Sequence, residues 1–134
     1  MNDLKLILRQ AIKDYDSPSV TYDFAKGRKV TYSDMAGVEK LIRCQLCSGM
    51  PDTVKDGLSN VLYWGYAQQE GRQRARVKIF RDNVKSSNLA KASDRFTKPD
   101  NLNVFDIKKI KLPEFSRMAF VSKIRMFLDP EYFA

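Results

Sequence analysis

The chain has 134 residues, and its 24 Lys and Arg against 16 Asp and Glu give it a formal net charge of +8. It contains no histidine, which excludes a Ser-His-Asp triad, a Cys-His dyad and every metal site that needs a histidine ligand. A hydrophobic fraction of 43% is enough for a core, and the length is typical of one domain, so we expect a single domain over residues 1–134.

Two predicted helices flank a short extended element in the first third of the chain. Apolar residues recur at the spacing of an amphipathic helix over residues 3–15 and again over about 33–47. Between them, residues 20–32 alternate with a period of two on either side of a loop that contains Gly27. This pattern predicts a short β-hairpin or an extended flap near residues 20–32, which needs helices to pack against.

The two cysteines, Cys44 and Cys47, form one C-x-x-C near the end of the second predicted helix. A zinc site needs four ligands, and the chain has no second cysteine pair. A redox pair is expected at a helix N-terminus, where the helix dipole lowers the thiol pKa. We therefore expect two reduced thiols, and the sequence predicts neither a metal site nor a cofactor.

The third predicted helix starts at Asp52 and runs to about residue 69. Gly65 lies on its apolar stripe, where glycine costs about 1 kcal/mol of helix propensity, so we expect another helix to pack closely there. Tyr63, Trp64 and Tyr66 are aromatic residues that either line the core or stack on bases. The stripe consists of Val54, Leu58, Val61, Leu62 and Gly65.

A basic helix is predicted over about 72–85. Its apolar residues Val77, Phe80 and Val84 point towards the core. Its basic residues either neutralise phosphates or form a solvated helix face, and the pattern leaves both readings open. Aligned on one face are Arg74, Lys78, Arg81 and Lys85, with Arg72 and Arg76 beside them.

Three more helices are predicted, over residues 87–96, about 102–110 and 114–128. On the last of them we expect Ser122 and Arg125 on the polar side, and Lys123 at the surface. The whole pattern predicts a mostly α protein, a compact bundle of about six or seven helices. The apolar side of the last helix consists of Phe120, Val121, Ile124, Phe127 and Leu128.

Residues 102–128 carry the most informative pattern. A short helix runs into a tight connection, Leu-Pro-Glu-Phe-Ser, and a longer helix follows. This layout resembles a helix-hairpin-helix, in particular that of the base-excision DNA glycosylases of the endonuclease III and 8-oxoguanine glycosylase superfamily. Leu112-Pro113, the apolar Phe115 and the small Ala119 match the family pattern, and residues 127–133 resemble the family's exit from the second helix.

The resemblance implies phosphate binding at this connection. In the family, two glycines let backbone N–H groups approach a phosphate at a helix N-terminus. Glu114 and Ser116 stand at the two glycine positions here. A plain helical hairpin that serves only packing is the alternative. The cations around the connection are Lys108, Lys109, Lys111 and Arg117.

The residues that carry catalysis in the family are not matched. Met118 stands at the position of the lysine that forms a Schiff base in some of those enzymes. The family's aspartate position, counted from Ser116, falls just after Ala134. The resemblance therefore implies a glycosylase-like scaffold without these two groups, and we lean towards a protein that is not an enzyme.

We predict a small, basic, helical module that binds nucleic acid through phosphate contacts. The alternative is a self-associating or partner-binding protein, a homo-oligomer formed through its apolar or aromatic surface; a residual DNA glycosylase or lyase is third. No stretch approaches the roughly 20 apolar residues of a spanning helix, and no signal peptide is visible, so we expect no membrane partner and a cytoplasmic location. The predicted nucleic-acid-binding residues are Arg72, Arg74, Arg76, Lys78, Arg81, Lys85, Lys108, Lys109, Lys111 and Arg117.

Overall fold

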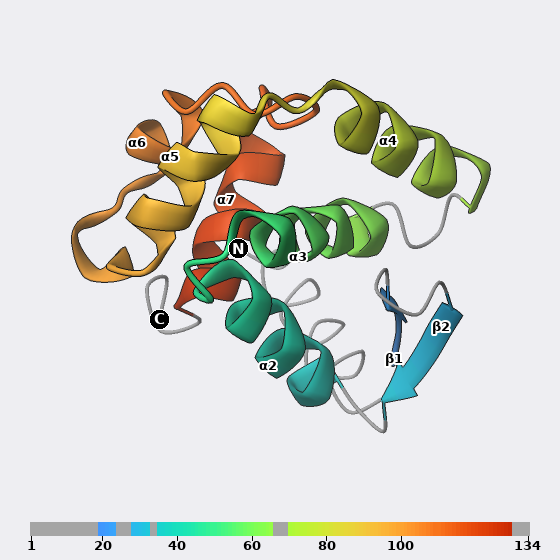
Figure 1. Ribbon diagram of the computed structural model, residues 1–134. Helices are drawn as coiled ribbons and strands as arrows, with labels where there is room; N and C mark the ends of the chain where they lie inside the picture. Colours follow the sequence, from blue (N-terminus) through green and yellow to red (C-terminus); the bar gives the residue numbers. More distant parts are fainter. Residues whose placement is uncertain (1–18, 24–27, 33–34, 66–69, 130–134) are drawn as a thin grey trace, which may run out of the picture.

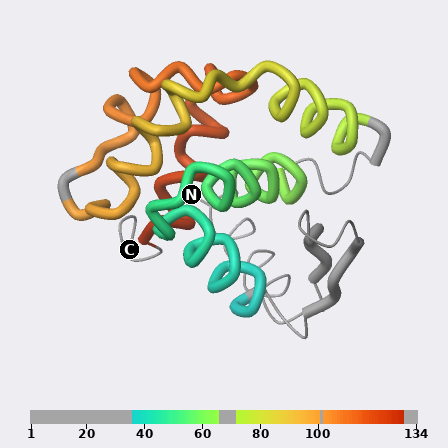
Figure 2. The backbone as a smooth tube through the Cα atoms, in the orientation of Figure 1, coloured from blue at the N-terminus to red at the C-terminus, as the bar shows by residue number. Residues whose placement is uncertain are grey.

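The computed structural model describes residues 19–23, 28–32, 35–65 and 70–129, and it describes side chains over 36–65, 72–100 and 102–129 (Figures 1 and 2). The described part is mostly helical, as the sequence predicts. The helix predicted over residues 3–15 lies outside the described residues. In chain order the elements are β1 (Ser19–Asp23), β2 (Arg28–Tyr32), α2 (Met35–Leu46), α3 (Pro51–Gly65), α4 (Glu70–Asn83), α5 (Ser86–Phe96), the 3-10 helix η1 (Pro99–Asn101), α6 (Val104–Lys108) and α7 (Met118–Leu128).

The two strands are antiparallel, with Ser19 opposite Tyr32 and Asp23 opposite Arg28. They fall inside the range for which the sequence predicts a hairpin or an extended flap, and residues 24–27 between them lie outside the described residues. The backbone of β1 lies beside α2 and α3, at the edge of the helical part (Figure 1). A two-stranded element is marginal alone, so its position beside two helices fits its need for packing.

Helix α3 is the central element, because it contacts α2, α4, α5 and α7 (Figure 1). It begins with Pro51, a residue that suits the first helical position because its missing N–H has no intrahelical partner there. Its predicted apolar stripe is buried, and so are the polar Ser59 and Asn60. Ser59 donates to the Lys55 carbonyl at 2.7 Å and Asn60 to the Gln45 side chain at 3.0 Å, so both polar groups keep hydrogen bonds.

Close helix packing explains the glycine at the end of α3, as predicted. A Cβ atom placed on Gly65 would lie 2.8 Å from Cε1 of Phe120 in α7. Gly57 has the same role towards α2, since a Cβ atom there would meet Gln45 Cβ at 3.0 Å and the Leu46 backbone nitrogen at 3.1 Å. These two glycines let α3 approach a helix on each of two sides.

The aromatic residues at the end of α3 line the core. Tyr63 is buried, and the Trp64 ring meets the Phe127 ring edge to face with centroids 5.5 Å apart. Tyr66 lies outside the described residues. Of the two uses that the sequence leaves open for these side chains, the described ones serve packing.

Helix boundaries differ from prediction in the second half of the chain. Helix α4 ends at Asn83, so Lys85 precedes α5 instead of extending the basic helix. Helix α6 is one and a half turns long and starts with a capping box, in which Asn103 accepts from the Asp106 amide and Asp106 accepts from the Asn103 amide. Helix α7 begins at Met118, since residues 113–117 form the turn before it.

The apolar side of α7 is buried as predicted, but the prediction for Arg125 is wrong. Arg125 is only 1% exposed. Helices α2, α3 and α6 all contact α7, so little of its circumference is left for a solvent-facing side. Arg43 of α2 reinforces this packing, because its Nε donates to the Phe127 carbonyl at 3.2 Å, near the negative end of the α7 dipole.

Candidate functional site

A cleft of about 500 Å³ lies between the first half of α4 and the connection from α6 to α7. We call residues 109–117 the α6–α7 connection and this cavity the arginine cleft. Two of its arginines come from α4 and one from the connection, so it joins two basic segments that the sequence treats as separate. It is lined by Gly65, Arg72, Arg76, Glu114, Ser116, Arg117 and Phe120.

Packing of the α6–α7 connection against α4 positions these groups. Leu112 and Phe115 are buried, and the Phe115 amide donates to the Leu112 carbonyl at 3.2 Å, which closes a tight turn. The Phe115 ring meets the ring of Phe80 in α4 edge to face, with centroids 5.7 Å apart. Arg76 is one helical turn before Phe80 and Glu114 is the residue before Phe115, so the aromatic contact brings these two side chains to the same place.

The ion pair of Arg76 and Glu114 crosses the cleft. Nη1 of Arg76 lies 3.4 Å from each carboxylate oxygen of Glu114. The Glu114 side chain is 17% exposed and the Arg76 side chain 38%, so the pair is half-screened from water. Glu114 has a φ of 69°, a left-handed conformation that favours glycine. The cleft therefore already contains one carboxylate.

The N-terminus of α7 adds positive potential to the cleft. Arg117 is the N-cap residue and is exposed, and no acidic side chain lies in the first turn of the helix. The unpaired N–H groups of a helix start carry roughly half a positive charge, which favours an anion. With Arg72 and Arg76 facing them, these groups give the cleft a positive character that the single carboxylate of Glu114 only partly offsets.

The other predicted basic residues are distributed over several surfaces. Arg81 turns towards α3, where its Nη1 lies 2.8 Å from Asp56 Oδ1 and 3.0 Å from Ser59 Oγ. Lys78 is exposed and pairs with Asp82 at 2.6 Å. The structure therefore does not bring the α4 cations together as one row. The remaining exposed members of the predicted set are Arg74, Lys85, Lys108, Lys109 and Lys111.

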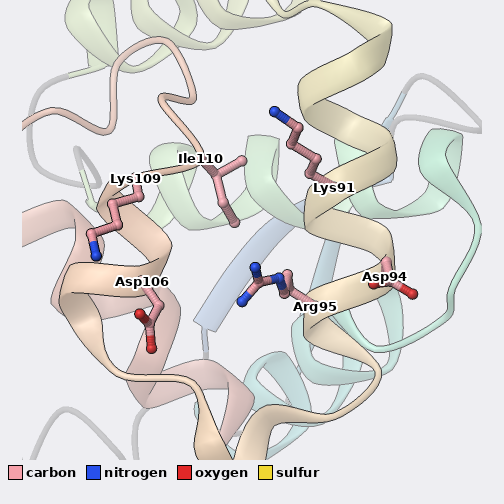
Figure 3. A pocket seen from close by; sticks show the side chains of 6 residues that line it. All are labelled: Lys91, Asp94, Arg95, Asp106, Lys109 and Ile110. Atoms are coloured by element: carbon pink, nitrogen blue, oxygen red, sulfur yellow. The ribbon is translucent and has the colours of Figure 1, made fainter.

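A second cavity, also of about 500 Å³, lies between α5 and α6 (Figure 3). We call it the α5–α6 groove. Sequence reasoning missed Lys91 and Arg95, although their spacing of four residues places them on one helix face. Asp94 points away from the groove in Figure 3. The groove is lined by Lys91, Asp94, Arg95, Asp106, Lys109 and Ile110.

Lys123 differs from the prediction of a surface position, since its side chain is half-buried. Its ammonium nitrogen lies 4.6 Å from the Phe120 ring centroid and 6.0 Å from that of Trp64. Burial lowers the pKa of the Lys123 amino group below its ordinary value. Lys123 is a neighbour of the arginine cleft through Phe120, but it is not among the residues that line it.

The two cysteines lie at the C-terminal end of α2, as predicted. Cys44 is exposed and Cys47 is half-buried, and both are free thiols. Burial raises the pKa of the Cys47 thiol, although the positive charge of Arg43 acts against it. This environment favours the protonated thiol, which is the less reactive form.

Two further searches bear on the class of site. Within the described ranges, no three His, Cys, Asp or Glu side chains are grouped so that they could hold a metal ion. None of the helices in those ranges combines the length and the apolar character that crossing a bilayer requires. No protein-family model, no curated protein and no solved structure matches this chain. The arginine cleft is therefore interpreted from its own geometry.

Proposed function

We propose that this chain is a non-enzymatic module that binds nucleic acid through phosphate contacts in the arginine cleft. One observation carries the proposal: Arg72 and Arg76 of α4 and Arg117 of the α6–α7 connection line one cavity. Guanidinium groups present several N–H donors in a planar fork, which suits the oxygens of a phosphate. The remaining charge of +8 attracts a polyanion at longer range.

The chemistry of the cleft favours contacts to the backbone over the reading of bases. Its charged groups are three arginines and one glutamate, and its apolar wall is Phe120 with Gly65. Contacts to phosphate oxygens position a nucleic acid but carry no sequence information. We therefore expect binding that depends strongly on salt and weakly on sequence.

The resemblance to a helix-hairpin-helix is part of this proposal. Two helices, α6 and α7, are joined by a short connection whose Leu112 and Phe115 are buried. Glu114 stands where the family pattern has its first glycine, and its φ of 69° is a conformation that glycine adopts without strain. The glutamate side chain and its charge remain a departure, and Arg76 holds that charge at 3.4 Å.

A salt titration tests the proposal. Fluorescence anisotropy is measured with a labelled 12-nucleotide oligo-dT and a 16-base-pair duplex at 50 and 200 mM salt. Three phosphate contacts predict that affinity falls about 20-fold for the single strand and about 40-fold for the duplex over this range, because the slope is about 0.7 or 0.9 per phosphate. No binding of either probe at 50 mM salt would refute the proposal.

Matched variants locate the interface. Arg72→Gln with Arg117→Gln removes two charges from the cleft, and Lys40→Gln with Lys55→Gln removes two charges from α2 and α3. Both double variants lower the net charge equally, so a non-specific charge effect is the same in both. We expect a clear loss of affinity and a shallower salt slope only for the cleft variant. A cytoplasmic location, predicted from the sequence, belongs to the same proposal.

Self-association is the second candidate, and the exposed Phe105 favours it. This side chain is 62% exposed on α6, whereas Tyr63 and Phe127, which the sequence offers as contact residues, are buried. An exposed phenylalanine is a frequent anchor at protein interfaces. Light scattering between about 5 and 500 μM tests this candidate, and a constant monomer mass over that range would contradict it.

A further inference from the structure

We propose that the α5–α6 groove is a second phosphate-binding site, and that one nucleic-acid strand runs along the α6–α7 connection from this groove to the arginine cleft. The inference rests on the proposed function and deepens it, because it names a ligand with several phosphates in one chain. A single phosphate group has no need of a second site.

The first support is the set of cations that the groove collects. Lys91 and Arg95 come from α5, and Lys109 follows the last turn of α6. In Figure 3, Arg95 extends from α5 into the space between the two helices. Within the part of the chain that the structure describes, none of these three side chains forms an ion pair, and all three are exposed. Their charges are therefore available to a ligand.

The two carboxylates of the groove do not cancel these charges. Oδ2 of Asp106 accepts a hydrogen bond from the Asn103 amide at 3.2 Å, as part of the α6 capping box. That carboxylate serves the start of α6, where a negative charge stabilises the helix. Asp94 points to the opposite side of α5 (Figure 3). Ile110, which is buried, forms an apolar part of the wall against which a sugar can rest.

The second support is the continuity between the two cavities. Lys109 lines the groove and Arg117 lines the cleft, and both belong to the α6–α7 connection. The exposed Lys111 lies between them, where the Asn88 side chain donates to its carbonyl at 3.5 Å. Eight residues of chain span at most about 28 Å, which about eight nucleotides of a B-form strand also cover.

Variants of the groove test the inference. Lys91→Gln with Arg95→Gln removes two exposed charges, and Lys40→Gln with Lys55→Gln is again the control of equal net charge. The probes are labelled oligo-dT of 12 and of 3 nucleotides, the shorter one reaching only a single site. Circular dichroism and thermal unfolding confirm that each variant is folded.

We expect the groove variant to lose affinity for the 12-nucleotide probe by about 5-fold per lost phosphate at 0.1 M salt, the factor that a slope of about 0.7 gives over the tenfold range to 1 M. Its affinity for the 3-nucleotide probe should change by less than about 2-fold, because the cleft remains. Equal behaviour of the groove variant and the control on the longer probe would overturn the inference while leaving the cleft proposal intact.

The outcomes separate the two proposals. Failure of the wild-type protein to bind any oligonucleotide at 50 mM salt would refute the proposed function itself. Vesicles with about 30% anionic lipid are the last arm of the experiment. A groove variant that loses vesicle binding but keeps full affinity for the 12-nucleotide probe would assign the groove to a lipid headgroup and overturn the inference.

Discussion

Glu114 lies with both carboxylate oxygens 3.4 Å from Nη1 of Arg76, across 38 residues of sequence. The pair joins the α6–α7 connection to α4 at the wall of the arginine cleft. It stabilises the approach of two elements, and it also places a negative charge where the proposed ligand brings its own. A phosphate that enters the cleft must compete with this carboxylate for Arg76.

We therefore expect Glu114→Gln to strengthen binding of the 12-nucleotide probe. The substitution keeps the size of the side chain and the backbone conformation but leaves the Arg76 charge available, so affinity rises and the salt slope becomes steeper by about 0.7. Anisotropy titrations at several salt concentrations measure both. Asp100→Asn on η1 is the control of equal charge change. Weaker binding by Glu114→Gln would mean that the carboxylate orients Arg76 for the ligand.

Arg81 gives the opposite expectation, although the sequence places it among the binding residues. Its Nη1 lies 2.8 Å from Asp56 Oδ1 and 3.0 Å from Ser59 Oγ, so it fastens α4 to α3. Arg81→Gln should lower the free energy of unfolding by about 1 kcal/mol, the usual value of a hydrogen bond. Urea unfolding measures this loss. The salt slope of oligonucleotide binding should stay unchanged, and a shallower slope would return Arg81 to the interface.

The two packed glycines of α3 should respond differently to alanine. At Gly57 the new Cβ would meet the backbone of α2, with the Leu46 nitrogen at 3.1 Å, so we expect a loss of about 1–3 kcal/mol. At Gly65 it would meet the edge of the Phe120 ring, which can turn, and alanine gains up to about 1 kcal/mol of helix propensity. Thermal unfolding of both variants compares them. A smaller loss at Gly57 than at Gly65 would contradict this account.

Lys123 predicts a specific pH dependence of stability. Burial lowers the pKa of its amino group in the folded state, so between that value and the ordinary pKa the unfolded chain binds more protons. The unfavourable contribution of the charged lysine is complete below this window and disappears as pH rises through it. The face of the Phe120 ring acts against this effect in part, because it favours the charged amine.

The measurement is the unfolding free energy of wild type and Lys123→Met between pH 7 and about 10.4, the ordinary pKa of lysine. The variant's stability relative to wild type should decrease steadily as pH rises. Lys40→Met on α2 gives the background change caused by removing a lysine. A relative stability of Lys123→Met that increases with pH would show that the ring contact outweighs burial.

Local patterns of the sequence were sufficient for the helices and their buried sides. The stripe Val54, Leu58, Val61 and Leu62 is buried because a helix repeats every 3.6 residues, and that period is visible in the sequence. Gly65 could be assigned to close packing because glycine is costly inside a helix. The mostly α class follows from such periodicities, each of which depends on residues a few positions apart.

The site depended on contacts that no local pattern contains. Arg76 and Glu114 meet because Phe80 and Phe115 pack together, and a pairing between distant residues cannot be read from the spacing of either segment. Arg125 carries a charge, so the sequence assigns it to the polar side of its helix, yet three helices enclose it. Composition and periodicity determined which residues form helices, whereas the packing of those helices decided which charges stay in water and which share a cleft.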